Sequence, residues 1–179
     1  MAEKGPSLVH GEEFAAWLGR FYQFWSYAEM ATSLAIGELL RITDEEAHLL
    51  TARMEFSRKA GLIRELLKRR KHPNESAIRS ALNKIQNESK RNILAHSILL
   101  SDDTALTFIE RGWQQDYVSE VHQFTMEEFV KHVHRFALAT GDLGRALGLS
   151  AERSGKFAAA ALKAQSKPRK SPKPPNDKT

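Results

Sequence analysis

Apolar side chains recur at helical spacing along most of this chain, and almost no stretch alternates as a β-strand would. In the first such stretch, apolar residues return every three or four positions, which is the spacing of one face of a helix. They are Phe14, Trp17, Leu18, Phe21, Phe24, Trp25 and Ala28. This face is expected to serve mainly in packing, and the pattern indicates an all-α fold.

Two further helices are expected in the middle of the chain. The first starts near Thr43, whose hydroxyl can cap the first turn, and three acidic residues at 44–46 complement the helix dipole. It is expected to run to the basic residues at 68–71, before Pro73. The next begins around Asn74 and continues without a break through 78–85 into the segment at 90–96.

The interval 97–124 lacks a clear helical period and is expected to be a long loop, or a small hairpin with residues 105–109 and 117–121 as its arms. Thr125 and Glu128 then have the spacing of a capping box, which opens a helix that should end near Gly148. The sequence therefore predicts an antiparallel bundle of four to five helices over residues 8–148, with that loop or hairpin between the last two main helices.

Positive charge is concentrated at the end of the chain. The whole sequence has 27 basic and 22 acidic residues, and residues 151–179 hold eight of the basic and two of the acidic ones, a net charge of +6. Residues 1–150 therefore carry 19 basic and 20 acidic residues, a net charge of −1. The alanine-rich segment 149–165 is expected to be a helical extension. Residues 166–179 contain four prolines and no large apolar side chain, and we expect this tail to be disordered.

Two basic segments are candidate RNA-binding sites because cations neutralise backbone phosphates. One is the end of the second expected helix, and the other is the tail. Their candidate residues are Lys68, Arg69, Arg70, Lys71, Lys167, Arg169, Lys170 and Lys173. Cations at a helix C-terminus are also ordinary capping chemistry, and a basic tail can simply aid solubility.

Several classes of site have no motif in this chain. It contains no cysteine, which excludes disulfides, thiol catalysis and cysteine-ligated metals. Glu128 and His132 lie four residues apart, but no second Glu-x-x-His pair completes a two-metal site, and a salt bridge between them is expected. We assign no metal and no cofactor. The sequence has no apolar run long enough for a membrane span and no leader-like segment, so a cytoplasmic protein with no membrane partner is expected.

The segment Arg91-Asn92-Ile93-Leu94-Ala95-His96 is the strongest candidate for chemistry. On this helix, the apolar stripe of Ile78, Leu82 and Ile85 continues onto Ser89, Asn92 and His96, which suits the wall of a cleft. His96 could act as a general acid or base at neutral pH, Arg91 could stabilise phosphate charge, and Glu29 could orient either. A structural role stays open, in which Arg91 pairs with Glu88 or Glu29.

This motif at the end of a long helical pattern resembles the HEPN superfamily, whose ribonucleases carry Arg, a polar residue, three variable residues and His. The resemblance implies a helical bundle, a homodimer with two motifs facing one composite cleft, and metal-independent RNA cleavage by the 2′-hydroxyl. It assigns Arg91, Asn92 and His96 to the active site. HEPN toxins paired with nucleotidyltransferases often have a tyrosine two residues after the histidine, where this chain has Ile98.

The function expected from the sequence is therefore a HEPN-type endoribonuclease that acts on RNA, as a toxin or phage-defence effector with an antitoxin or regulatory protein as partner. The alternative is a non-catalytic helical dimerisation module that binds nucleic acid or a partner protein.

Overall fold

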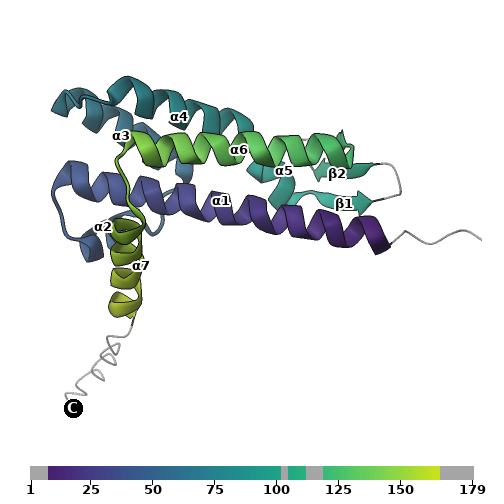
Figure 1. Ribbon diagram of the computed structural model, residues 1–179, viewed down its shortest axis with the longest axis horizontal. Coiled ribbons are helices and arrows are strands. Elements are labelled where there is room, and N and C mark those ends of the chain that lie inside the picture. The colour runs from purple at the N-terminus through teal and green to yellow at the C-terminus, as the bar shows by residue number, and fades with distance from the viewer. Residues whose placement is uncertain (1–7, 102–104, 112–118, 166–179) are drawn as a thin grey trace, which may run out of the picture.

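In a computed structural model the chain is mostly helical, with a small antiparallel sheet at one end of the long helices (Figure 1). The structure describes residues 8–101, 105–111 and 119–165. The helices are α1 (Leu8–Leu40), α2 (Asp44–Thr51), α3 (Phe56–Arg70), α4 (Glu75–Glu88), α5 (Arg91–His96), α6 (Met126–Ala146) and α7 (Ala151–Gln165). The strands are β1 (Ile98–Ser101), β2 (Leu106–Arg111) and β3 (Ser119–Phe124).

The long helix α1 provides one wall of the core. Its predicted apolar face is buried at Phe14, Phe21 and Ala28, while the other aromatic residues of the stripe are partly buried against the same core. α1 packs against α3 and α6, and α4 packs against α3 and α6. Phe21 and Phe136 bring α1 and α6 together, with ring centroids 4.9 Å apart. The predominantly helical class predicted from periodicity is confirmed.

Both N-terminal caps that the sequence predicts are present. Thr43 opens α2 and Thr125 opens α6, and each forms a capping box with the glutamate three residues later. The end of α6 also falls as predicted, since Leu147 is its C-cap and Gly148 follows with a φ of +68°. These boundaries could be predicted because hydrogen bonds within four residues determine them.

The prediction of one continuous helix from Thr43 to Lys71 is wrong. α2 ends at Thr51 and α3 starts at Phe56, although the residues between them contain neither glycine nor proline. Tertiary packing accounts for the break, because α2 lies against α1 and α7 whereas α3 runs between α1 and α4. The buried Phe56 anchors the start of α3 on Trp25, with 5.2 Å between the ring centroids.

The prediction that the third helix runs into the motif is also wrong. α4 ends at Glu88, and Lys90 has φ 38° and ψ 24°, a left-handed conformation that an α-helix does not allow. α5 then starts in a new direction as a short helix of 6 residues. Consequently the motif does not continue the buried stripe of α4.

The sheet has the strand order β1-β2-β3, with both pairs antiparallel (Figure 1). The β2–β3 pair confirms the small hairpin. Strand β1 has no counterpart in the sequence-based expectation. The fold is therefore mostly helical with a small three-stranded sheet, and not all-α as predicted. Leu106 and Phe108 point from β2 into the core, where Phe108 contacts Phe14 at a ring-centroid distance of 6.1 Å. The sheet thus closes one end of the helical core.

The alanine-rich extension is a helix, α7, and it packs against α2 and α1. Phe157 is buried and stacks on His48 with ring centroids 3.9 Å apart, and Arg153 forms ion pairs with Asp44 and Glu38. None of the helices that the structure describes is long and apolar enough to cross a membrane. The predicted disordered tail, 166–179, lies outside the described residues.

Candidate functional site

A pocket of about 710 Å³ opens where the two unpredicted helix breaks meet. α1 contributes Trp25 and Glu29, and the end of α4 contributes Gln86 and Asn87. The α2–α3 turn with the start of α3 contributes residues 52–57, and the α4–α5 turn with the start of α5 contributes residues 89–93. Both turns carry polar side chains into the same space. The pocket has the size of common small-ligand sites, which span about 300–1,000 Å³.

Arg91 is directed into this pocket by the turn that precedes it. Lys90 in its left-handed conformation redirects the chain, and the buried Leu94 fixes α5 against the core. The Tyr22 hydroxyl of α1 donates a hydrogen bond of 3.3 Å to the carbonyl oxygen of Leu94. With α5 held at this point, Arg91 at the start of the helix lines the pocket, whereas His96 at its end is exposed and does not line it.

The guanidinium of Arg91 has an unusual environment. Its Nε is buried and has no hydrogen-bond partner among the described residues. Its Cζ lies 5.9 Å from the centroid of the Trp25 ring, within the range of a cation–π contact. Buried polar atoms in proteins are nearly always hydrogen-bonded, so an unpaired guanidinium nitrogen in a pocket wall is a candidate anchor for an anion.

The structural pairings expected for Arg91 are absent from the described residues. Glu88 pairs with Arg135 at 3.4 Å, and Glu29 pairs with the buried Lys59 at 2.5 Å. The Glu29 carboxylate is therefore already neutralised where it lines the pocket, and among the described residues it accepts no hydrogen bond from Arg91 or His96.

The charge of the pocket is positive once these pairs are considered. Arg53, Lys90 and Arg91 line it together with Glu29 and Glu55, and Lys59 from outside neutralises Glu29. Lys90 also extends toward the sheet, since its Nζ lies 5.0 Å from the centroid of the Phe124 ring. The remaining balance is three cations against one carboxylate.

The start of α3 adds to this positive potential. Its N-cap, Glu55, makes no side-chain capping hydrogen bond, and its first turn contains no acidic residue. The N-terminus of a helix carries a partial positive charge and free N–H groups, which favour an anion nearby.

The residues of the predicted active site are only partly brought together. Arg91, Asn92 and Glu29 line the pocket, whereas His96 is exposed on the last turn of α5 and does not line it. Of the expected cleft-wall stripe, Ser89 and Asn92 line the pocket and His96 does not, because the left-handed Lys90 interrupts the helix that would have aligned them.

The predicted RNA-binding segments lie away from the pocket. Residues 68–71 are exposed at the C-terminal end of α3, whose N-terminal end lines the pocket. A helix of 15 residues separates the two by about 22 Å. The tail residues Lys167, Arg169, Lys170 and Lys173 lie outside the described residues.

The expected salt bridge between Glu128 and His132 is not found among the described residues. Glu128 accepts hydrogen bonds from the backbone and side chain of Thr125, and these hydrogen bonds hold its pKa below the ordinary value. His132 is buried between aromatic rings, and burial lowers its pKa, with Lys90 and Arg135 acting in the same direction. His132 is therefore a neutral core residue.

Two groups of residues have no counterpart in the sequence-based expectation. The α2–α3 turn places Arg53 and Glu55 in the pocket, and only the tertiary arrangement indicates this. On the sheet, Glu110, Glu120 and His122 bring three potential metal-ligating atoms within 4.8 Å of one another. The Glu-x-His spacing at 120–122 was a usable signal, because residues i and i+2 share one face of a strand.

Comparison with models of protein families found no match for this chain. No curated protein and no solved structure matched it either. The function is therefore argued from the geometry of the pocket and the sheet.

Proposed function

We propose that this protein binds single-stranded RNA, with a backbone phosphate in the Arg91 pocket. The observation that carries the proposal is the Nε of Arg91, which is buried in the pocket wall without a hydrogen-bond partner among the described residues. A phosphate oxygen would supply the missing acceptor, and the planar donor fork of arginine suits phosphate better than a point charge does.

Three neighbours of Arg91 support an RNA ligand over a free inorganic anion. Trp25 places an aromatic ring in the pocket wall, where it can contact a base, and aromatic contacts to bases are sequence-tolerant. Asn92 and Gln86 add amide groups that can hydrogen-bond a base edge or a ribose hydroxyl. The pocket volume of about 710 Å³ leaves space for a nucleotide rather than a phosphate alone.

The binding test compares two arginines, each of which lies over a tryptophan of α1. Arg91→Ala removes the pocket cation, and Arg20→Ala removes an exposed arginine whose Cζ lies 4.3 Å from the Trp17 ring, outside the pocket. Fluorescence anisotropy with a short labelled RNA should show a loss of roughly 10- to 100-fold in affinity for Arg91→Ala, the value of a hydrogen bond to a charged group. Arg20→Ala should bind as the wild type does, and equal affinity of all three proteins would reject the pocket.

The second candidate function is the metal-independent endoribonuclease that the HEPN resemblance implies. It is favoured by the position of Arg91 and Asn92 in one pocket with His96 exposed on the same short helix. Because His96 does not line the pocket of its own chain, cleavage requires Arg91 of one copy and His96 of another to meet in a homodimer. In that arrangement Arg91 would stabilise the charge of the transition state and His96 would transfer the proton.

Complementation distinguishes this enzyme from a binding module. Wild-type protein in EDTA should leave 2′,3′-cyclic phosphate ends on RNA, and Arg91→Ala and His96→Ala should each be inactive. Mixing the two variants should restore part of the activity, because a mixed dimer contains one intact composite site. If the wild type does not cleave, or if His96→Ala still does, the enzyme hypothesis is wrong and the binding proposal stands on its own test.

The assembly proposed here is a homodimer in which α1, α3, α4 and α6 form the antiparallel bundle. Light scattering should give a mass of roughly twice the 20.2 kDa of the chain. For the enzyme, the role we propose is that of a bacterial toxin or phage-defence effector acting in the cytoplasm, with an antitoxin protein as its regulator. A monomer at micromolar concentration would contradict the composite site.

A further inference from the structure

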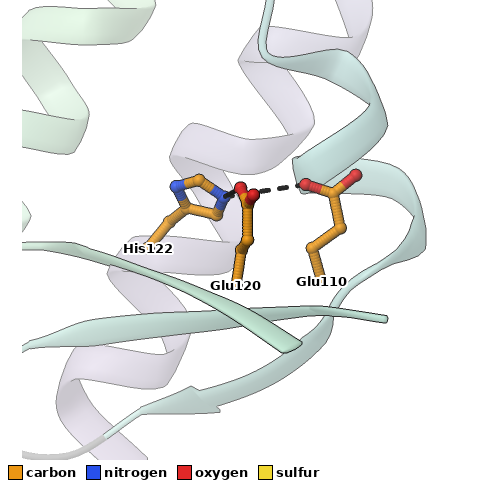
Figure 2. Close-up of side chains that lie close together, drawn as sticks. All are labelled: Glu110, Glu120 and His122. Atoms are coloured by element: carbon orange, nitrogen blue, oxygen red, sulfur yellow. Dashed lines mark ion pairs between the residues drawn. The ribbon is translucent and has the colours of Figure 1, made fainter. Parts of the chain in front are cut away.

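The register of the sheet brings two carboxylates and an imidazole together on the side that faces the core. Glu110 of β2 is directly opposite Glu120 of β3, and Phe108 is opposite His122. Residues two apart on one strand share a face, so Glu120 and His122 project to the same side. Figure 2 shows the three side chains extending from the two strands toward one another.

The Nε2 of His122 lies close to both carboxylates. It is 3.6 Å from a carboxylate oxygen of Glu110 and 3.8 Å from one of Glu120 (Figure 2). The same atom is buried and has no hydrogen-bond partner among the described residues, although the side chain as a whole is 27% exposed. A buried imidazole nitrogen that faces two carboxylates without a hydrogen bond has an unsatisfied need for a partner.

A cation between the two glutamates would stabilise the β2–β3 pair. Like charges directly opposite each other on an antiparallel pair destabilise it, and Glu110 and Glu120 occupy such a pair. The Glu110 and Glu120 side chains are 42% and 71% exposed, so an ion from solvent can reach them.

We propose that Glu110, Glu120 and His122 bind a divalent transition-metal ion, with zinc as the best fit. One imidazole nitrogen and two carboxylate oxygens are the donor set that zinc accepts, whereas magnesium and calcium prefer oxygen alone. Around a tetrahedral zinc with bonds of 2.0–2.2 Å, ligand atoms lie about 3.4 Å apart. The pairs at 3.6 and 3.8 Å are close to that separation, and the third pair lies within 4.8 Å.

Bound in this way, the ion cross-links β2 and β3 and leaves a coordination position for water or another ligand. The site adds to the proposed RNA binding and does not depend on it, because no residue of the triad lines the Arg91 pocket.

The test is titration of the tag-free, full-length protein with zinc by calorimetry, followed by cobalt substitution to read the coordination from its absorption spectrum. The wild type should bind one zinc per chain, and the cobalt form should show intense visible bands of a tetrahedral ion. Glu110→Gln and Glu120→Gln keep the side-chain shape and should each lower the zinc affinity by roughly tenfold or more. Glu127→Gln, an exposed residue that pairs only with Lys131 among the described residues, is the matched control.

The zinc titrations decide whether the three residues form a metal site. Stoichiometric zinc binding that both triad variants weaken and the control does not would establish the site, with circular dichroism confirming that each variant is folded. Absence of stoichiometric binding to the folded wild type, or binding that is unchanged in the Glu110→Gln and Glu120→Gln variants, would overturn the proposal.

Discussion

Replacing His132 with leucine should remove a pH-dependent loss of stability. The His132 ring is buried among Phe21, Phe124 and Phe129, and its Nε2 has no hydrogen-bond partner among the described residues. Burial lowers the pKa of His132, nearby Lys90 and Arg135 lower it further, and Glu88 opposes them. The folded protein therefore keeps this histidine neutral at a pH where the unfolded chain takes up a proton.

The magnitude follows from proton linkage. An unfolded histidine has a pKa near 6.5, so protonation stabilises the unfolded chain by about 1.4 kcal/mol at pH 5.5 and by less than about 0.1 kcal/mol at pH 7.5. Because the folded pKa is lowered, the unfolded state binds more protons in this window, and stability falls as the pH falls below about 6.5. His132 thus costs up to about 1.4 kcal/mol at pH 5.5, and His132→Leu abolishes that cost.

Urea denaturation followed by circular dichroism at pH 7.5, 6.5 and 5.5 measures this difference. The stability of His132→Leu relative to wild type should rise as the pH falls from 7.5 to 5.5, by up to about 1.4 kcal/mol. Phe136→Leu is the matched control, because it shortens a buried ring on the same helix and leaves every ionisable group in place. Parallel pH profiles for wild type and His132→Leu would refute a neutral, desolvated His132.

Three other changes test the packing and the charge. Thr125→Ala should cost about 1 kcal/mol in urea denaturation, because the α6 cap loses its side-chain acceptor, and an unchanged midpoint would contradict this role. Gly144→Ala should lower the Tm because the added Cβ would clash with the Tyr27 hydroxyl, and adding Tyr27→Phe to this variant should recover part of the loss. An unchanged Tm of Gly144→Ala would contradict the clash. Deleting 166–179 should reduce the salt dependence of RNA binding while the Arg91 effect persists, and an unchanged salt slope would show that the tail makes no phosphate contacts.

The parts of the fold that could be predicted are those fixed by local chemistry. The aromatic face of α1 repeats at helical spacing, and the caps at Thr43 and Thr125 depend on hydrogen bonds to glutamates three residues away. The turn at Gly148 follows from the freedom of glycine at positive φ.

The parts of the fold that could not be predicted include two helix breaks that no glycine or proline marks. The residues between α2 and α3 include no glycine or proline, and Lys90 adopts a left-handed conformation that glycine or asparagine would have signalled. β1 is only 4 residues long and depends on its pairing with β2, so its own sequence has no independent period. Packing between distant segments determines these features.

The candidate site depends on the same breaks. Arg91 and Asn92 could be singled out from their motif, but the contribution of Arg53 depends on the end of α2, which the sequence does not indicate. The triad on the sheet depends on the register that places Glu110 opposite Glu120, and the hairpin arms predicted from sequence did not set that register.

The turn at Lys90 decides what the Arg91–His96 motif can do. A helix continuing from α4 would have placed Asn92 and His96 beside the core and turned Arg91 away from them. Instead the buried Leu94 holds α5, so that Arg91 faces the pocket with an unpaired nitrogen while His96 faces solvent. In the proposed binding mode a phosphate completes the hydrogen bonding of Arg91 within one chain, whereas the proposed cleavage takes His96 from a second copy. The two proposed functions are therefore separable: Arg91→Ala should weaken RNA binding by roughly 10- to 100-fold and abolish cleavage, and His96→Ala should abolish cleavage alone.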